Sequence, residues 1–474
     1  MNQNKEKNPN KNSIKNTEKM EEIVSLAKRR GFIFQGSEIY GGLAGTWDYG
    51  PLGITLKNKI KKMWWNNFVE KRADIFGVDA AILMNSKVWE ASGHVGGFND
   101  PLVDDLKTKK RYRADHLLEE AELDVIGKSI EEMDQMIRDN GIKSPDGNEL
   151  GPVKQFNMMF KTEIGASGDG TSVSYLRPET AGGIFVNFKN VLDSMHPRMP
   201  FGIAQIGKAF RNEIAPRDFI FRVRELEQME IEYFIHPDNW KEEFEKWRIA
   251  IHEWNELIGL PSENVYELEV GDVDRAHYSD RTIDFEFDFP FGRKELYGLA
   301  YRTNYDLTKH SEASGAKLEY FDDQTGERYI PHVIEPSLGL DRTILAIISA
   351  AYDKDEVGGE ERTVLRFNPI VAPFKVAVFP LLKNRPELIE KSKEVFQMFD
   401  NSEGTINYDD SGNIGKRYRR QDEIGTPYCV TVDFDTLEDE SVTVRDRDTG
   451  EQDRIKIAEL GEYLNTKLGF SVIK

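Results

Sequence analysis

The sequence of 474 residues has only one cysteine, Cys429, so it has no means of forming an internal disulfide or a cysteine-based zinc site. Its longest apolar run, 344–351, is far too short to cross a bilayer, and the first twenty residues lack the apolar core of a secretory signal. These shortages argue against integral-membrane and disulfide-built secreted proteins. They predict a soluble protein of a reducing compartment, most simply the cytoplasm, with no membrane partner.

Positive charge is also scarce, and the net charge of −20 argues against a protein that coats nucleic acid indiscriminately. A specific RNA partner is still compatible with this charge, because basic residues cluster at 107–113 and at 416–420. Each cluster is explained equally well as a solvated charged face or as a nucleic-acid contact.

The pattern along the chain predicts three parts. Residues 1–19 are rich in Asn and Lys with almost nothing apolar, and they are predicted to form a flexible tail. Globular patterning runs over 20–368, interrupted at about 100–160 by a charge-rich insertion that is predicted to be mostly helical. Over 369–474 short strands alternate with helices, which indicates a small α/β domain.

A helix predicted over 54–69 carries Trp64, Trp65 and Phe68. Three large aromatic side chains on one helix exceed what a solvent-exposed face tolerates. They belong either to the core or to a subunit interface, and the sequence does not decide between the two.

The segment 202–234 is predicted to form two long strands joined by a loop around Pro216. Alternation along a strand places the following residues on shared faces: Arg211 with Glu213, and Arg222 with Arg224, Leu226, Gln228 and Glu230. Buried arginines and glutamates need partners. Either an ion-pair ladder satisfies them, or they form a polar floor that binds phosphates, which Arg holds bidentately.

A second segment, 332–348, predicts a strand that ends at Glu335, a turn at Pro336 and a helix from about Gly339. Arg342 falls in the first turn of this helix, where a basic side chain is unfavourable unless an anion lies near. A bound phosphate explains this placement, and so does an ion pair with Asp341 or a remote acid.

Two of these segments match known motifs in the expected order. Phe210-Arg211-Asn212-Glu213, followed by a loop and Phe221-Arg222, resembles motif 2 of the class II aminoacyl-tRNA synthetases, and Gly339-Leu340-Asp341-Arg342 resembles their motif 3. The helix within 54–69 resembles their motif 1 region, which forms the dimer interface of that class. Further segments are similar to the homodimeric glycyl-tRNA synthetases, and they lie at 36–53, 91–104, 111–119, 175–188, 295–307 and 335–342.

The resemblance covers the chain from about residue 21 to its end, and it implies a fold and an activity. The fold is α+β: a class II catalytic domain over 20–368, with an antiparallel sheet flanked by helices and a helical insertion, then an anticodon-binding domain over 369–474. The activity is ATP-dependent activation of glycine to glycyl-adenylate, with Mg²⁺, and transfer to the 3′ end of tRNA(Gly) by a homodimer. Some relatives carry paired cysteines where this chain has 104–113, so no zinc is expected here.

The resemblance also implies roles at the ATP site. Arg211 and Arg342 are the expected catalytic residues, with Arg211 on the α-phosphate, where charge develops. Glu213 would contact the adenine amino group, Phe221 would stack beneath the base, and Glu295 would bind ATP through the metal ion. The predicted ATP-binding set is Arg211, Asn212, Glu213, Phe221, Arg222, Val223, Arg224, Glu225, Leu226, Glu295, Leu296, Gly339, Leu340, Asp341 and Arg342.

A glycine site must hold an ammonium group and leave no room for a methyl group, so an acidic and tightly packed pocket is expected. The predicted glycine-binding set is Arg113, Glu179, Gln228, Glu230, Glu335 and Ser337. Each glutamate is alternatively explained by a structural salt bridge. The predicted tRNA-binding set, in which an aromatic ring could stack on an unpaired base, is Lys416, Arg417, Tyr418, Arg419 and Arg420.

Two rival functions share this architecture. The first is a class II synthetase for another amino acid such as proline, threonine or serine, against which the acidic pocket argues. The second is a nucleic-acid-binding subunit that has lost the ATP-binding arginines, whereas Arg211, Arg222 and Arg342 are all present here.

Overall fold

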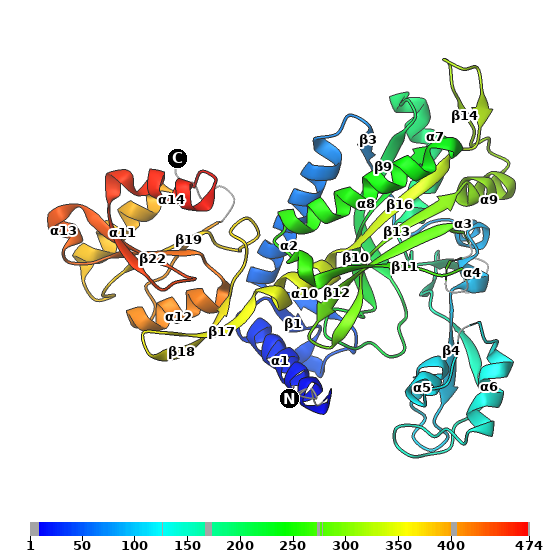
Figure 1. The fold of residues 1–474 in the computed structure, drawn as a ribbon, viewed down its shortest axis with the longest axis horizontal. Coiled ribbons are helices and arrows are strands. Elements are labelled where there is room, and N and C mark those ends of the chain that lie inside the picture. The colour runs from blue at the N-terminus through cyan, green and yellow to red at the C-terminus, as the bar shows by residue number, and fades with distance from the viewer. Residues whose placement is uncertain are drawn as a thin grey trace, which may run out of the picture.

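The computed structural model describes residues 9–125, 127–165, 173–272, 275–276, 278–399 and 405–472. A large body built on one sheet lies beside a smaller C-terminal body, and a small lobe projects from the large body around α5 and α6 (Figure 1). No helix in these ranges is long and apolar enough to span a membrane.

The large body is organised by a seven-stranded sheet with the order β11-β12-β13-β16-β10-β9-β3. Its strands are β3 Ile75–Gly77, β9 Phe201–Phe210, β10 Glu225–Ile235, β11 Val265–Glu269, β12 Arg281–Phe289, β13 Gly292–Thr303 and β16 His332–Gly339. Every neighbouring pair is antiparallel except β3 with β9, which confirms the predicted antiparallel sheet.

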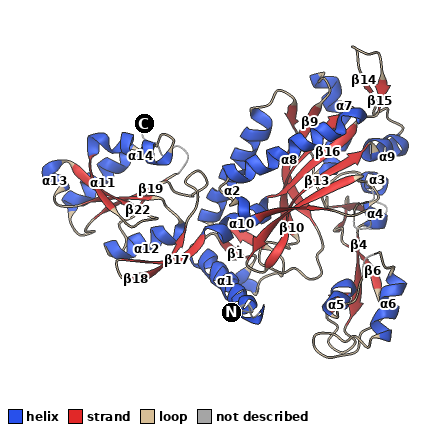
Figure 2. Ribbon diagram, viewed as in Figure 1, coloured by secondary structure: helices blue, strands red, loops and turns tan. Residues whose placement is uncertain are grey.

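Helices cover both faces of this sheet (Figure 2). They are α2 Pro51–Trp65, α7 Ala181–Met195, α8 Trp240–Leu257, α9 Tyr305–Ser314 and α10 Leu340–Ala351. Met229 and Ile231 on β10 pack with α2, α8 and α10, whereas Phe234 packs with α7 and α9 on the other face. This alternation places the even-numbered polar residues of β10 on the α7 side.

The tryptophan helix is part of the chain's own core. Trp64 is fully buried, and Phe68 stacks on Trp247 of α8 with ring centroids 5.9 Å apart. Trp65 is partly buried, and a π-helical turn, Asn66–Glu70, extends the helix. The structure therefore assigns Trp64 and Phe68 to internal packing and not to a subunit interface.

The N-terminal helix begins within the predicted tail. Helix α1 spans Pro9–Arg29, so the part of the predicted tail over 9–19 is helical. The buried side chains of Ile23 and Leu26 anchor this helix in the core. Lys and Glu are good helix formers, so the polar residues 9–19 can continue the helix that these side chains anchor.

The insertion at about 100–160 is not mostly helical, which corrects the prediction. It contains a three-stranded sheet with the order β5-β4-β6 and two short helices. The elements are β4 Asn99–Asp104, β5 Arg111–Arg113, β6 Lys154–Asn157, α5 Ala114–Glu120 and α6 Ile130–Asp139. These strands are short and charged, so they show no apolar alternation that would reveal them.

Two further predictions in the large body are corrected. The loop between β9 and β10 spans 211–224, so Arg211, Glu213, Arg222 and Arg224 lie in this loop and not on strands. No turn occurs at Pro336, because β16 continues through it to Gly339.

The smaller body confirms the predicted alternation of strands and helices. Its sheet has the order β20-β19-β21-β22-β23, and β19 is parallel to both of its neighbours. The elements are β19 Val376–Pro380, β20 Ile406–Tyr408, β21 Tyr428–Val432, β22 Ser441–Asp446, β23 Gln452–Lys456, α11 Pro386–Met398, α12 Ile414–Ile424, α13 Thr436–Asp439 and α14 Leu460–Leu468.

Short elements complete the fold. A hairpin of β17 Tyr352–Val357 and β18 Glu360–Leu365 lies between the two bodies (Figure 1). The others are β1 Ile33–Gln35, β2 Trp47–Tyr49, β7 Lys161–Glu163, β8 Val173–Tyr175, β14 Tyr320–Phe321, β15 Arg328–Tyr329, α3 Ser86–Ala91 and α4 His94–Gly97.

Candidate active site

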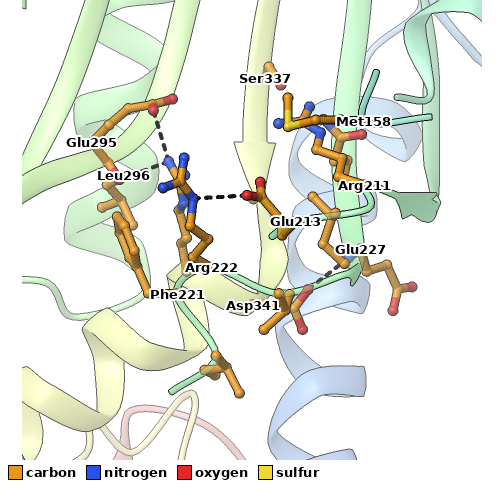
Figure 3. A pocket seen from close by; sticks show the side chains of 16 residues that line it. Met158, Arg211, Glu213, Phe221, Arg222, Glu227, Glu295, Leu296, Ser337 and Asp341 are labelled. Atoms are coloured by element: carbon orange, nitrogen blue, oxygen red, sulfur yellow. Dashed lines mark hydrogen bonds and ion pairs between the residues drawn. The ribbon is translucent and has the colours of Figure 1, made fainter. Parts of the chain in front are cut away.

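A cavity of about 300 Å³ opens where the loop between β9 and β10 meets β13, β16 and the start of α10 (Figure 3). Most of the predicted ATP-binding residues line it: Arg211, Glu213, Phe221, Arg222, Val223, Leu226, Glu295, Leu296, Gly339, Asp341 and Arg342. Residues far apart in the sequence therefore meet at one concave site, which we call the arginine cavity.

Two of its three predicted arginines are paired with carboxylates. Arg222 Nε lies 3.2 Å from Glu213 Oε2, and Arg342 Nη1 lies 2.9 Å from Glu295 Oε2. Figure 3 shows these two carboxylates turned toward the guanidinium groups between them. The charge of Arg342 lowers the pKa of Glu295, so this carboxyl is ionised at neutral pH.

Arg211 has a different environment. Its Nε donates to the carbonyl of Pro178 at 3.0 Å, and no ion pair within the described residues includes it. An ion-pair ladder therefore accounts for Arg222 and Arg342 in part, but it does not account for Arg211. An arginine without a carboxylate partner in a cavity is well suited to bind an anion.

Four predicted ATP-binding residues lie outside the arginine cavity. Asn212 bonds through its backbone N–H to Met158, and Arg224 donates to the carbonyls of Glu213 and Ala44. Glu225 forms an ion pair with a lysine on the neighbouring strand, and Leu340 is fully buried in the core. These residues belong to the matching motifs but do not line the arginine cavity.

The floor of the arginine cavity holds a network that the sequence did not reveal. Asp341 Oδ2 accepts a hydrogen bond from the backbone N–H of Glu227 at 2.7 Å, and its Oδ1 accepts one from the hydroxyl of Tyr49. Lys57, which is only 4% exposed, lies 2.8 Å from the Glu227 carboxylate. This network ties α2 and α10 to β10 and so fixes the position of the helix that carries Arg342.

A second cavity, of about 290 Å³, adjoins the first. Glu179, Gln228, Glu230, Glu335 and Ser337, five of the six predicted glycine-binding residues, line it, so we call it the acidic cavity. Both cavities are lined by Arg211, Gln228, Glu295 and Ser337.

The hydrogen bonds of the acidic cavity hold Glu230 in place. It accepts bonds from the backbone N–H of Thr180 at 3.1 Å, the hydroxyl of Ser337 at 2.7 Å and the side-chain amide of Gln228 at 2.8 Å. Glu335 accepts a bond from Arg302 Nη1 at 2.9 Å. These contacts orient both carboxyl groups, which line the same cavity.

The acids of this cavity differ in charge. Burial opposes ionisation of Glu179, but His94, 3.3 Å away, together with Arg302 and Arg211, lowers its pKa to about 2. Burial and the charge of Glu179 raise the pKa of Glu230. Burial also raises the pKa of Glu335, with Arg302 acting in the opposite direction. The cavity thus holds at least one firm negative charge and neighbours that resist further ionisation.

Asp284 is a further cavity residue that the sequence analysis missed. Burial, then the charges of Glu295 and Glu286, raises the pKa of Asp284 to about 7. Glu286 and Glu295 are partners across β12 and β13. The signal was the alternation of acids along 284–288, which resembles an ordinary exposed strand face.

Arg113 lies outside both cavities, so its assignment to the glycine site stays a prediction. It forms ion pairs with Asp100 at 2.9 Å and Asp115 at 2.5 Å, all within the insertion. Its charge still acts on the ATP side, where it helps to lower the pKa of Arg222.

The basic helix α12 presents only part of its predicted surface. Arg417 is fully buried and donates to the carbonyls of Pro380, Asp410 and Gly412, and the ring of Tyr418 packs on Phe379. Arg417 therefore completes the interior of the small body, whereas Tyr418 is partly exposed. The others, Lys416, Arg419 and Arg420, line a cavity of about 600 Å³ at the start of α12.

Comparison with known proteins agrees with this geometry. Residues 160–351 match the family model of the tRNA synthetase class II core domain (G, H, P, S and T), and residues 375–467 match that of the anticodon binding domain. The first range contains every residue that lines the two cavities except Met158, which lines the arginine cavity. The second range contains the whole of α12.

Relatives match nearly the whole chain. A glycine--tRNA ligase of Bacillus anthracis is 51% identical over 459 residues, which are 95% of this chain and 99% of the relative. Those of Clostridium acetobutylicum and Staphylococcus saprophyticus are each 52% identical, over 465 and 467 residues, covering 96% of this chain and 100% of each relative. Together with the class II core and its two adjoining cavities, this similarity shows that the chain belongs to the glycine--tRNA ligase family.

Proposed function

We propose that this chain, an aminoacyl-tRNA ligase by its family, activates glycine with ATP across the two adjoining cavities and then transfers it to tRNA(Gly). The observation that carries the proposal is the shared wall of these cavities. One cavity is rich in arginine and the other in carboxylates, and Arg211 lines both. For the glycine carboxylate to attack the α-phosphate, acids must hold the glycine ammonium next to the arginines that hold the phosphates.

In the arginine cavity, Arg211 is the residue we assign to the α-phosphate. It has a fixed position through Pro178 and no carboxylate to neutralise it within the described residues, so it can stabilise the charge that develops during attack. Arg222 and Arg342 would hold the other phosphates, and Phe221, whose ring lies 4.4 Å from the Arg342 guanidinium carbon, would lie beneath adenine. Neither step needs a protein nucleophile.

The acids near Arg342 fit a magnesium ion. Mg²⁺ is commonly held by one or two carboxylates together with substrate phosphates, and Glu295 and Asp284 supply two carboxyl groups at the edge of the shared wall. Burial raises the pKa of Asp284 most, and the charges of Glu295 and Glu286 raise it further, an effect that a cation would relieve. When bound, the ion would neutralise phosphate charge. Among the described residues no group of three or more acids or histidines is arranged to hold a metal by itself.

In the acidic cavity, Glu179, Glu230 and Glu335 would bind the ammonium of glycine, and Ser337 would border the space beside its α-carbon. The four side chains line a confined volume of about 290 Å³, and Thr180 and Arg302 hold two of the acids in place. Because glycine offers no side chain to grasp, we propose that other amino acids are excluded by steric fit beside Ser337.

The smaller body, 369–474, is proposed to bind the anticodon arm, and 20–368 with its insertion to form the catalytic domain. Lys416, Arg419 and Arg420 support an RNA contact because they border one cavity at the start of α12. We omit Arg417 and Tyr418 from this surface, since both are engaged in the interior. The proposed location is the cytoplasm, where charged tRNA is used.

We propose a homodimer whose interface includes the segment before α2. Ile39 and Tyr40 are 89% and 86% exposed, and Leu43 close by is also exposed. Apolar side chains clustered on one loop mark an interaction surface. Replacing Ile39 and Leu43 together by aspartate should convert a dimer to a monomer in light scattering. A wild-type monomer at micromolar concentration would contradict the assembly itself.

The direct test of the reaction is exchange of labelled pyrophosphate into ATP with glycine, alanine, serine and proline in parallel. Exchange with glycine alone is expected. Exchange with another amino acid would preserve the ATP site and overturn the glycine pocket. No exchange with any of them, from folded protein with magnesium, would overturn the catalytic assignment.

A further inference from the structure

Glu232 on β10 is a buried acid for which the proposed reaction has no role. Its side chain is fully buried, and neither carboxyl oxygen has a hydrogen-bond partner among the residues that the structure describes. An ionised carboxylate in such a place is strongly unfavourable, because burial removes its hydration and nothing replaces it. Its position behind the acidic cavity calls for a functional explanation.

Strand register places Glu232 against a residue of the glycine pocket. The pairing of β10 with β16 sets Tyr233 opposite Ile334, so Glu232 stands across from Glu335. Alternation along β10 also puts Glu232 on the same face as Glu230. Two carboxyl groups therefore lie side by side in the interior, one lining the cavity and the other behind it.

The charge of one guanidinium, that of Arg302, acts on both acids of this pair. Arg302 on β13 is 1% exposed, and it uses Nε and Nη2 on Asp306 of α9, each at 2.9 Å. Only its Nη1 reaches Glu335, also at 2.9 Å. The acids around Arg302 thus outnumber it. The other titratable groups that face this cluster are Glu179, Glu230, Tyr278 and His310.

Like charges this close cannot both ionise in a site sheltered from water. Burial raises the pKa of Glu232 well above its usual range, the charge of Glu335 raises it further, and Arg302 opposes these effects only in part. Burial raises the pKa of Glu335 as well. Charge and burial together favour one retained proton on the pair.

We propose that Glu232 is a positioning residue for glycine: the Glu232–Glu335 pair holds one proton in the absence of glycine and releases it to solvent when the glycine ammonium binds beside Glu335. The inference rests on the proposed assignment of the acidic cavity to glycine. The ammonium supplies the positive charge that lets both carboxyls ionise, so glycine binding and proton release are linked. Affinity for glycine then rises with pH, because the competing proton is already lost.

Proton release is measurable on the wild-type protein alone. The probe is the glycyl-sulfamide of adenosine, a stable analogue of the adenylate, titrated by calorimetry at about pH 7.5 in buffers of different ionisation enthalpy. We expect release of roughly 0.3 to 1 proton per site. The acetyl-sulfamide, which lacks the ammonium, should release none. Binding of the glycyl compound without proton release would overturn the proposal.

The matched variant is Glu232→Gln, which keeps the size of the side chain and leaves Glu335 alone with Arg302. In the wild type the glycine KM for pyrophosphate exchange should fall roughly three- to ten-fold between about pH 6 and pH 8. In Glu232→Gln this slope and the proton release should disappear while kcat is kept. Equal proton release in both proteins would place the proton elsewhere and overturn the proposal.

A control separates this role from a structural one. Asn255 on α8 is another buried polar side chain without a described hydrogen-bond partner, and it lies outside both cavities. Asn255→Leu can change stability but should leave the pH slope of KM intact. If the pocket assignment itself is wrong, Glu335→Gln leaves the glycine KM unchanged. If only the proton linkage is wrong, Glu335→Gln raises KM while wild type shows no slope.

Discussion

The arginines of the paired cavities and those of α12 stand out equally in the sequence, yet the fold gives them different surroundings. Arg211 has one carbonyl partner and faces a cavity, whereas Arg417 donates to three backbone carbonyls and faces none. Arg445 of β22 likewise uses its guanidinium on Asp422 of α12. An arginine can bind a ligand when some of its donors face a cavity, and its residue type does not reveal this.

The largest effect is expected at Arg211. Replacing it with Gln should lower kcat/KM for glycine-dependent pyrophosphate exchange by about 10² to 10³, because charge developing on the phosphate loses its donor. Thermal stability should change little. Glu225→Gln, at the start of β10 and outside the cavities, is the control and should remain near wild type. If both variants lost exchange activity equally, a position in the cavity lining would not explain the loss at Arg211.

Arg417 should behave in the opposite way. Arg417→Ala leaves buried carbonyls without donors, which should destabilise the small body by about 2–4 kcal/mol. Thermal unfolding would detect this as a lower transition temperature, while Lys416→Ala on the exposed side of α12 should leave it unchanged. Loss of tRNA affinity in Arg417→Ala without loss of stability would contradict the structural role.

The exposed face of α12 sharpens the comparison further. Neutralising Lys416, Arg419 and Arg420 together should weaken tRNA binding by about ten-fold and reduce its dependence on salt. Pyrophosphate exchange, which needs no tRNA, should be unaffected. Filter binding at several salt concentrations measures both quantities, and an unchanged salt slope would exclude this face from the RNA contact.

The smallest effect concerns Asp284, whose pKa is raised to about 7. Because its ionised form would assist magnesium binding, the apparent magnesium affinity in exchange assays should fall a few-fold as pH drops through about 7. The same raised pKa makes its contribution to folding stability decline as pH rises. Asp284→Asn should abolish the pH dependence of the magnesium affinity. If that dependence were retained, another group would be its source.

The order of many elements followed from local patterns, whereas most site residues followed from the resemblance to class II synthetase motifs. Strand alternation and turn residues predicted the strands of the small body and the pair β9 and β10, since these signals come from neighbouring residues. The spacing of apolar residues did not reveal α7, whose first turn contains two glycines. It did not reveal the sheet of the insertion either, because those strands are short and charged. It also misplaced Arg222 and Arg224 on a strand, because the loop between β9 and β10 is longer than a turn signal indicates.

The sequence by itself determined the family, through motif residues that resemble those of class II synthetases, and it determined which residue types could bind phosphate and ammonium. Only the tertiary structure decided which of them face a cavity, as Arg211 and Glu230 do, and which complete the interior, as Arg417 and Trp64 do. It also brought Glu232 against Glu335. The reason is physical: composition and period are local, whereas burial and the pairing of charges depend on contacts between distant parts of the chain.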